Sequence, residues 1–145
     1  MTKTFHLAIP VRNLNKAIEF YCNVLGCKKG NSENNPPFSW CDIDFWGNEL
    51  TLHSSISEFK VDERHLVEKE DVLIPHFGVH LDAEEFQSLK GKLVQDWKNV
   101  EFVNKPYVRF KGDELEQETM FIKDPSGNIL EFKTMVNPDA LFKTT

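Results

Sequence analysis

The chain has 145 residues, of which 40% are hydrophobic and 28% are charged, and its formal net charge is −6. A chain of this size can fold around its own core, a negative charge disfavours a nucleic-acid partner, and no apolar run is long enough to span a membrane. The three cysteines are an odd number at no metal-binding spacing, and the first residues lack the apolar stretch of a signal peptide. We therefore expect reduced thiols and a cytoplasmic location.

A faint internal repeat organises the chain. The run that begins at His6 aligns with the run that begins at His76, an offset of 70 residues, and Gly47-Asn48 aligns with Gly127-Asn128, an offset of 80. The chain is interpreted as one domain with four parts: module one (1–56), a charged connector (57–71), module two (72–136) and a C-terminal tail (137–145).

In module one the hydrophobic pattern changes from strand-like alternation to helical spacing and back to alternation. Residues 5–11 alternate as a strand, and Asn13 then provides an N-cap for a helix that stops at Gly26. Two further strands are predicted near 38–46 and 49–55, with Gly47-Asn48 as the turn between them.

Module two repeats this order. After a strand that begins at His76, Asp82 and Glu85 have capping-box spacing at the start of a helix, whose apolar stripe runs from Phe86 to Trp97. Strands are predicted near 107–111, 117–123 and 129–135. The pattern predicts an α+β fold: two β-α-β-β-β modules forming a curved mixed sheet, with the helices on its convex face and a cup on its concave face.

Alternation assigns the strand side chains to two faces, and the polar set faces the cup if the apolar set faces the helices. His6, His76 and Glu131 then emerge on the same side of three different strands, and the two histidines hold equivalent positions in the repeat. Two imidazoles and one carboxylate form a facial triad, which makes Fe²⁺ the first expectation. The ligand types alone also suit Mn²⁺, Ni²⁺, Co²⁺ or Zn²⁺.

The strand-opening histidines, together with Asp124-Pro125-Ser126-Gly127-Asn128 followed by Leu130-Glu131-Phe132, resemble the vicinal oxygen chelate superfamily over almost the whole chain. That group contains glyoxalase I, extradiol dioxygenases, fosfomycin-modifying enzymes and bleomycin-resistance proteins. The resemblance implies a divalent ion held by His6, His76 and Glu131. It also implies a small-molecule substrate that chelates the ion through two adjacent oxygens, and a homodimer as the assembly.

The resemblance is closer to the extradiol dioxygenases than to glyoxalase I, because Thr51 stands where glyoxalase I enzymes carry a fourth ligand. His53 stands at the strand end that carries their acid/base histidine, and it is the predicted catalytic residue; Phe121 replaces their usual tyrosine. The leading interpretation is a metal-dependent enzyme most like a ring-cleaving dioxygenase. The alternatives are a glyoxalase-, epimerase- or thiol-transferase-type enzyme, and a metal-free ligand-sequestering protein of the bleomycin-resistance type.

Three further side chains are predicted to bind the substrate in the cup. Tyr107 and Arg109 alternate with Val108 and Phe110, which should face the helix, and a guanidinium at Arg109 suits a carboxylate or phosphate. Trp40 would supply an aromatic wall. The alternatives are a solvated strand face for the first two and a dimer contact for Trp40.

Overall fold

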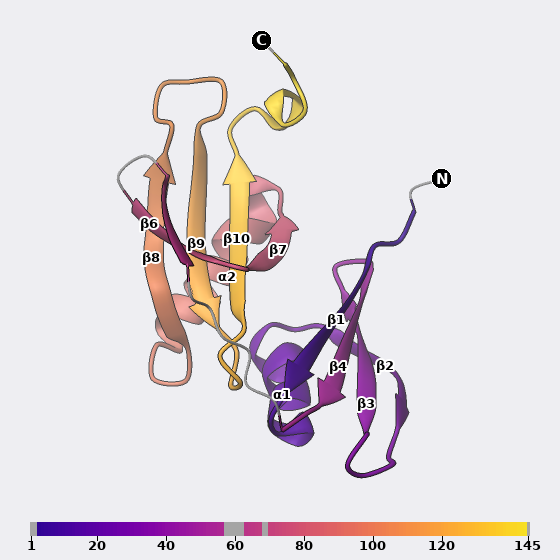
Figure 1. Ribbon diagram of the computed structural model, residues 1–145. Helices are drawn as coiled ribbons and strands as arrows, with labels where there is room; N and C mark the ends of the chain where they lie inside the picture. The colour runs from indigo at the N-terminus through magenta and orange to yellow at the C-terminus, as the bar shows by residue number, and fades with distance from the viewer. Residues whose placement is uncertain (1–2, 57–62, 68–69, 145) are drawn as a thin grey trace. The chain divides into compact units, whose positions relative to one another are not determined.

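The computed structural model describes residues 3–56, 63–67 and 70–144, and the chain divides into two compact units. Unit one comprises Met1–Lys60 with Asp124–Asn128, and unit two comprises Val61–Lys123 with Ile129–Thr145. Each unit contains a four-stranded mixed sheet and a helix in the order β-α-β-β-β, which confirms the α+β class (Figure 1). Within the described residues, no helix is both long and apolar enough to cross a membrane.

Unit one is built around a sheet with the strand order β1-β4-β3-β2, in which β1 runs parallel to β4. The strands are β1 (His6–Val11), β2 (Lys28–Glu33), β3 (Trp40–Phe45) and β4 (Asn48–Ser54). Helix α1 (Leu14–Glu19) continues into a π-helical turn at Phe20–Val24 and contacts β3 and β4. The Asn13 side chain accepts a hydrogen bond from the Lys16 backbone N–H at 3.0 Å, which confirms the N-cap.

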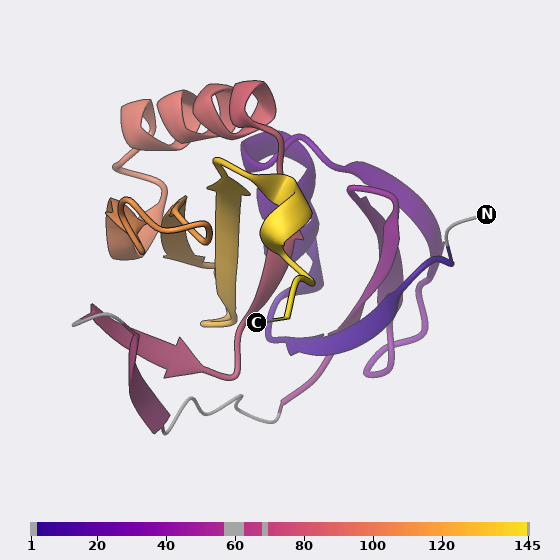
Figure 2. The same ribbon diagram turned by 90° about the horizontal axis from the view of Figure 1, so that it is seen from above.

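Unit two contains a second sheet with the order β7-β10-β9-β8. The strands are β7 (Phe77–His80), β8 (Glu101–Arg109), β9 (Gln117–Lys123) and β10 (Ile129–Met135). Helix α2 (Ala83–Gln95) covers one face, and a hairpin of β5 (Glu63–Val67) and β6 (Glu70–Ile74) lies on the other (Figure 2). The capping box of Asp82 and Glu85 is confirmed, and a 3₁₀ turn at Pro138–Ala140 follows β10.

Three strands were not predicted. Every residue of β2 is exposed and its sequence carries no apolar alternation, so its pairing as an edge strand leaves no hydrophobic signature. The β5–β6 hairpin forms in the predicted connector, of which residues 57–62 and 68–69 lie outside the described residues. The turn between β3 and β4 also lies one residue earlier than predicted, because its positive φ angles are those of Trp46 (48°) and Gly47 (83°).

Alternation assigns the apolar residues of the strands to the face under the helices, and four of them are buried: Leu50, Leu52, Leu130 and Phe132. Two other assignments are wrong. Helix α2 ends at Gln95, so Trp97 lies beyond it and is 65% exposed rather than part of the apolar stripe. Val108 is half exposed, because the helix does not cover the outer strand there.

The turn between β9 and β10 belongs to unit one and is held by a dense set of hydrogen bonds. Asp124 accepts from the Ser126 and Asn128 backbone N–H groups and from the hydroxyl of Tyr21, which is fully buried. The Asn128 amide donates to the Pro10 carbonyl at 3.0 Å. This part of the Asp-Pro-Ser-Gly-Asn segment therefore has a structural role at the end of β1.

Candidate metal and substrate site

Glu131 is the centre of the site in unit two. It lies on β10, on the sheet face opposite α2, and is 5% exposed. Its Oε2 atom accepts hydrogen bonds from Arg109 Nη2 at 2.7 Å and Thr119 Oγ1 at 2.6 Å. Its Oε1 atom lies 3.3 Å from His76 Nε2 and 3.5 Å from Lys133 Nζ. One carboxylate oxygen is therefore fixed by short bonds, while the other faces an imidazole.

The surroundings of Glu131 keep it ionised. Burial by itself would raise the pKa of the carboxyl group, but the His76 hydrogen bond, the Lys133 charge, the Thr119 hydroxyl and the Arg109 charge together lower it to about 2. At neutral pH the site contains a buried carboxylate anion.

His76 presents its Nε2 atom to that carboxylate. Its Nδ1 atom lies 2.6 Å from the Leu73 carbonyl oxygen, so Nδ1 carries the proton and Nε2 faces Glu131. The ring edge packs against Phe121, with 5.1 Å between the centroids. The hydrogen bond to Glu131 raises the His76 pKa against the opposing effect of burial. An Nδ1–H group donated to a backbone carbonyl is the usual orientation of a histidine whose Nε2 atom binds a metal.

The pair fits a shared divalent ion. Metal–ligand bonds of about 2.1 Å at a right angle put the two ligand atoms about 3 Å apart. The 3.3 Å separation between His76 Nε2 and Glu131 Oε1 is close to that spacing. Two residues alone do not complete a site: within the part of the chain that the structure describes, no group of three or more His, Cys, Asp or Glu residues is arranged to hold a metal.

His6, the third predicted ligand, belongs to unit one, where it opens β1 and is exposed. Its Nδ1 atom lies 2.7 Å from Glu49 Oε1. This contact uses the Nδ1 atom of His6 and not its Nε2 atom, as the Leu73 contact does for His76. The structure thus brings His76 and Glu131 together, and the participation of His6 stays a prediction.

Two predicted substrate-binding residues lie beside Glu131. Arg109 is 7% exposed, and its guanidinium bonds both Glu131 and the Gln117 side-chain oxygen, so the contacts observed are those of a group that positions the carboxylate. The Tyr107 hydroxyl is buried beside Arg109, and the Arg109 guanidinium interacts with it. Burial raises the Tyr107 pKa. Substrate binding by either residue remains a prediction.

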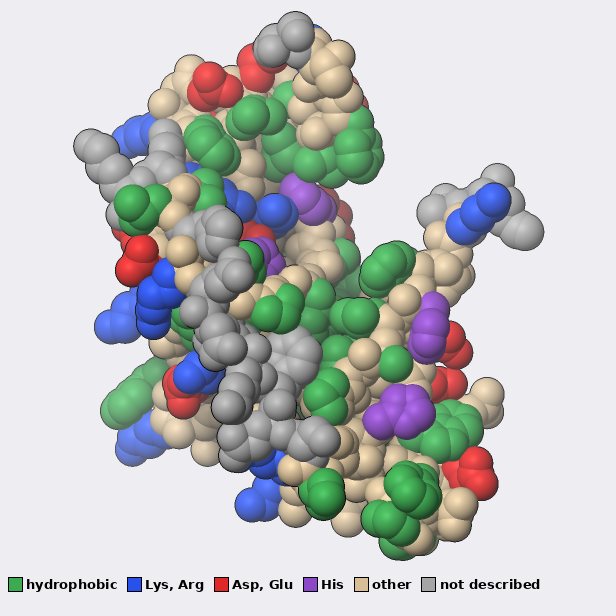
Figure 3. Space-filling view, in the orientation of Figure 1, with side chains coloured by type: hydrophobic (Ala, Val, Ile, Leu, Met, Phe, Trp, Pro, Cys, Tyr) green, Lys and Arg blue, Asp and Glu red, His purple; other side chains and the backbone are tan. Residues whose placement is uncertain are grey.

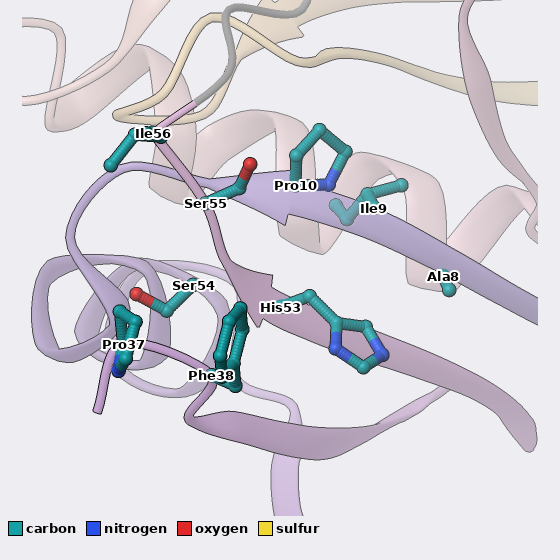
Figure 4. A pocket seen from close by; sticks show the side chains of 9 residues that line it. All are labelled: Ala8, Ile9, Pro10, Pro37, Phe38, His53, Ser54, Ser55 and Ile56. Carbon is teal, nitrogen blue, oxygen red and sulfur yellow. The ribbon is translucent and has the colours of Figure 1, made fainter. Parts of the chain in front are cut away.

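The other two predicted residues lie in unit one. His53 is exposed at the end of β4 and lines an apolar pocket of about 560 Å³, between Phe38 and the strand that carries Ala8 and Pro10 (Figure 4). Trp40 pairs with His53 across the sheet but is not among the pocket's lining residues; its indole N–H donates to Glu33 Oε2 at 3.1 Å. The pocket therefore offers one imidazole among apolar walls.

The two units differ in surface character. Figure 3 shows histidine beside basic side chains on the viewed face of unit two, whereas on unit one histidine lies near both acidic and apolar side chains. Sequence reasoning did not assign a role to Thr119, Gln117 or Lys133. Alternation places Thr119 and Lys133 on the same face as Glu131, but their contacts depend on strand register, which the sequence does not reveal.

Comparison with known proteins agrees with this architecture. A model of the Glyoxalase/Bleomycin resistance protein/Dioxygenase superfamily matches residues 3–132. The chain is similar to the crystal structure of a glyoxalase/bleomycin resistance protein/dioxygenase from Alicyclobacillus acidocaldarius, with 31% identity, coverage of 97% of this chain and 96% of that chain, and a TM-score of 0.75.

The fold is also shared with the fosfomycin resistance protein FosX from Listeria monocytogenes, in a mutant complexed with Mn(II) and 1S,2S-dihydroxypropylphosphonic acid, at 14% identity, 99% coverage of both chains and a TM-score of 0.71. A virulence protein from Salmonella typhimurium matches at 20% identity, 94% and 98% coverage and a TM-score of 0.62. The family match and the first of these relatives confirm the resemblance, and this chain belongs to the Glyoxalase/Bleomycin resistance protein/Dioxygenase superfamily.

Proposed function

We propose that the protein is a metal-dependent enzyme that binds a divalent ion through His6, His76 and Glu131 and acts on a small molecule with two adjacent oxygens. The observation that carries the proposal is the geometry at Glu131. Arg109 and Thr119 fix one carboxylate oxygen, while the other faces the Nε2 atom of His76. Membership of a superfamily that contains enzymes supports the same conclusion.

The orientation of both histidines supports their role as ligands. A ring nitrogen bonded to an oxygen acceptor fixes the tautomer and raises the basicity of the other nitrogen. His76 has the Leu73 carbonyl for this purpose and His6 has the Glu49 carboxylate. Fe²⁺ is the first expectation for the ion, and Mn²⁺, Ni²⁺, Co²⁺ and Zn²⁺ suit the same ligands.

A divalent ion bound there supplies a Lewis acid for two adjacent oxygens and lowers the pKa of a bound hydroxyl. In this proposal, His53 accepts the proton of a substrate hydroxyl, because an imidazole is a common general base at neutral pH. Phe38 and Pro10 line the apolar pocket that contains His53. Arg109 and Thr119 keep Glu131 ionised and correctly oriented.

Ring-cleaving dioxygenation is the reaction that the pocket around His53 favours, since its apolar walls suit an aromatic ring with adjacent hydroxyls. Oxygen uptake by Fe²⁺-loaded protein with a series of catechols tests this reaction. No uptake in the presence of bound iron would direct attention to isomerase, epimerase and thiol-transfer assays. A homodimer, checked by sedimentation, and a cytoplasmic location remain predictions from the sequence.

The direct test of the proposal is elemental analysis of protein purified without chelators. We expect about one equivalent of a first-row divalent metal in the wild type and a large loss in His6→Ala, His76→Ala and Glu131→Gln. Glu118→Gln is the matched control, because Glu118 lies on the neighbouring strand β9 and pairs with Lys90 of the helix. Wild-type protein that binds no metal even after reconstitution would contradict the proposal and leave ligand sequestration as the function.

A further inference from the structure

The β5–β6 hairpin packs against the face of the unit-two sheet that lies opposite α2 (Figure 2). The cluster that it buries there contains four residues: Val72 and Leu73 of β6, Phe121 of β9 and Ile129 of β10. Phe121 pairs with Glu131 across the two strands, and residues paired in this way share one face of a sheet. The hairpin is therefore fixed to the same face from which Glu131 emerges.

The end of this hairpin sets the orientation of the His76 ring. Strand β6 ends at Ile74, and the carbonyl oxygen of Leu73 lies 2.6 Å from His76 Nδ1. The edge of the imidazole also packs against Phe121, with 5.1 Å between the ring centroids and the planes at 90°. Phe121 thus contacts the imidazole as well as the buried residues of the hairpin. A displacement of β6 along the sheet would move the Leu73 carbonyl away from Nδ1.

Asn104 of β8 ties the hairpin backbone to the sheet. Its Nδ2 atom donates to the Asp71 carbonyl oxygen at 3.0 Å, and Asp71 lies two residues before Leu73 on β6. Its Oδ1 atom is buried and has no hydrogen-bond partner among the described residues, although buried polar atoms normally have one. A leucine of similar size would bury no such oxygen, so stability alone does not require an amide here. The contact with the hairpin is the interaction that an apolar residue could not replace.

We propose that the β5–β6 hairpin orients His76 for metal binding, and that Asn104 and Phe121 are the positioning residues through which the sheet holds the hairpin and the ring. The hairpin supplies the Leu73 carbonyl to Nδ1, which leaves Nε2 for the ion. An acceptor at one ring nitrogen fixes the tautomer and the orientation of a ligating histidine. This inference rests on the proposed function, because it gives both residues a role in the same site.

The first test uses metal-free protein and ¹H–¹⁵N NMR of the full chain with ¹⁵N-labelled histidine. We expect a slowly exchanging Nδ1–H signal of His76, assigned by its absence in His76→Ala. Asn104→Leu and Phe121→Leu should speed its exchange with solvent at least about fivefold, because one loosens the hairpin and the other removes the ring that the imidazole packs against. Asn104→Leu should leave the midpoint of thermal unfolding unchanged or raise it, because it removes the unpartnered oxygen.

The second test is Zn²⁺ affinity, measured by competition with a chromophoric chelator. Asn104→Leu and Phe121→Leu should weaken binding about tenfold, since groups that orient a metal ligand contribute about 10–100-fold. Asn99→Leu is the matched control for the amide, because Asn99 donates to Asp96 in the turn after α2. Phe86→Leu is the matched control for the ring, because Phe86 is a buried residue of α2. Both controls should leave zinc affinity and Nδ1–H exchange unchanged.

Unchanged Nδ1–H exchange in both positioning variants, equal effects in their controls, or a wild-type Nδ1–H that exchanges as fast as that of free imidazole would each overturn the inference. Faster exchange without any loss of zinc affinity would overturn it as well. Circular dichroism checks that each variant folds, and Asn104→Leu carries the test if Phe121→Leu does not fold. If the wild type binds no zinc, the metal-centred function fails, and the NMR comparison still decides whether the hairpin positions His76.

Discussion

The two units place different chemistry at equivalent positions of their sheets. Thr51 of unit one lies opposite Ala8, and Glu131 of unit two lies opposite Gly78. Thr51 donates a 2.6 Å hydrogen bond to Asp42, while Glu131 accepts from Arg109 and Thr119 and faces His76. Burying a carboxylate destabilises a fold unless hydrogen-bond donors or cations surround it. The β-α-β-β-β unit therefore tolerates a charged side chain at this position only where neighbouring strands supply such groups.

The largest expected difference between the units concerns Gly78, which pairs with Glu131, and Ala8, which pairs with Thr51. A Cβ atom at Gly78 would overlap the carbonyl oxygen of Glu131, whereas Ala8 already carries one in unit one. Gly78→Ala should lower the free energy of unfolding by about 4 kcal/mol or more, because the backbone of β10 must move to make room for the added methyl group. Ala8→Gly should cost about 0.5–1 kcal/mol. Urea unfolding of the two variants checks this comparison, and similar losses would contradict it.

The hairpin turns give the next largest difference. Asp124 is buried and accepts four hydrogen bonds, including that of Tyr21, whereas Asp44 is exposed and accepts one from Gly47. We expect Asp124→Ala to destabilise the protein by about 3 kcal/mol and Asp44→Ala by less than about 1 kcal/mol. Thermal unfolding measures both, and an equal effect would show that the Asp124 network contributes little.

A smaller difference is expected at the equivalent polar sites. Arg109→Met removes the cation bonded to the buried Glu131, which should cost about 2–3 kcal/mol, since Thr119 and His76 remain as partners. Thr51→Val removes one hydrogen bond of the less buried Asp42 and should cost about 1 kcal/mol. If Arg109→Met proves as stable as the wild type, the guanidinium is not what holds the carboxylate.

The helix caps should show the smallest difference, because in both units the side chain of the N-cap residue accepts a hydrogen bond from a backbone N–H group of the first helical turn. The Asn13 side chain caps α1 with one hydrogen bond, and Asp82 caps α2 within a capping box. Asn13→Ala and Asp82→Ala should each cost about 1 kcal/mol, with the capping box slightly more sensitive. Chemical denaturation of both variants checks this near-equality.

Local patterns predicted much of this fold. Both helix caps, the alternating strands and the shared face of His76 and Glu131 were readable, because each depends on residues close in sequence or on strand periodicity. The edge strand β2 was not, since its exposed residues carry no apolar signal. Nor were the contacts of Arg109 with Gln117 and Glu131, because they depend on the register between strands.

The central claim is that Glu131 of unit two is a metal ligand, whereas Thr51, which holds the equivalent position in unit one, is not. Metal affinity is the most direct test of this claim. Equilibrium dialysis with Zn²⁺ compares wild type, Glu131→Gln, His76→Ala and Thr51→Ala. We expect the first two variants to weaken binding at least about 100-fold and Thr51→Ala to leave it unchanged, because Thr51 is not among the proposed ligands. Tight binding that survives both Glu131→Gln and His76→Ala would contradict the assignment of the metal site.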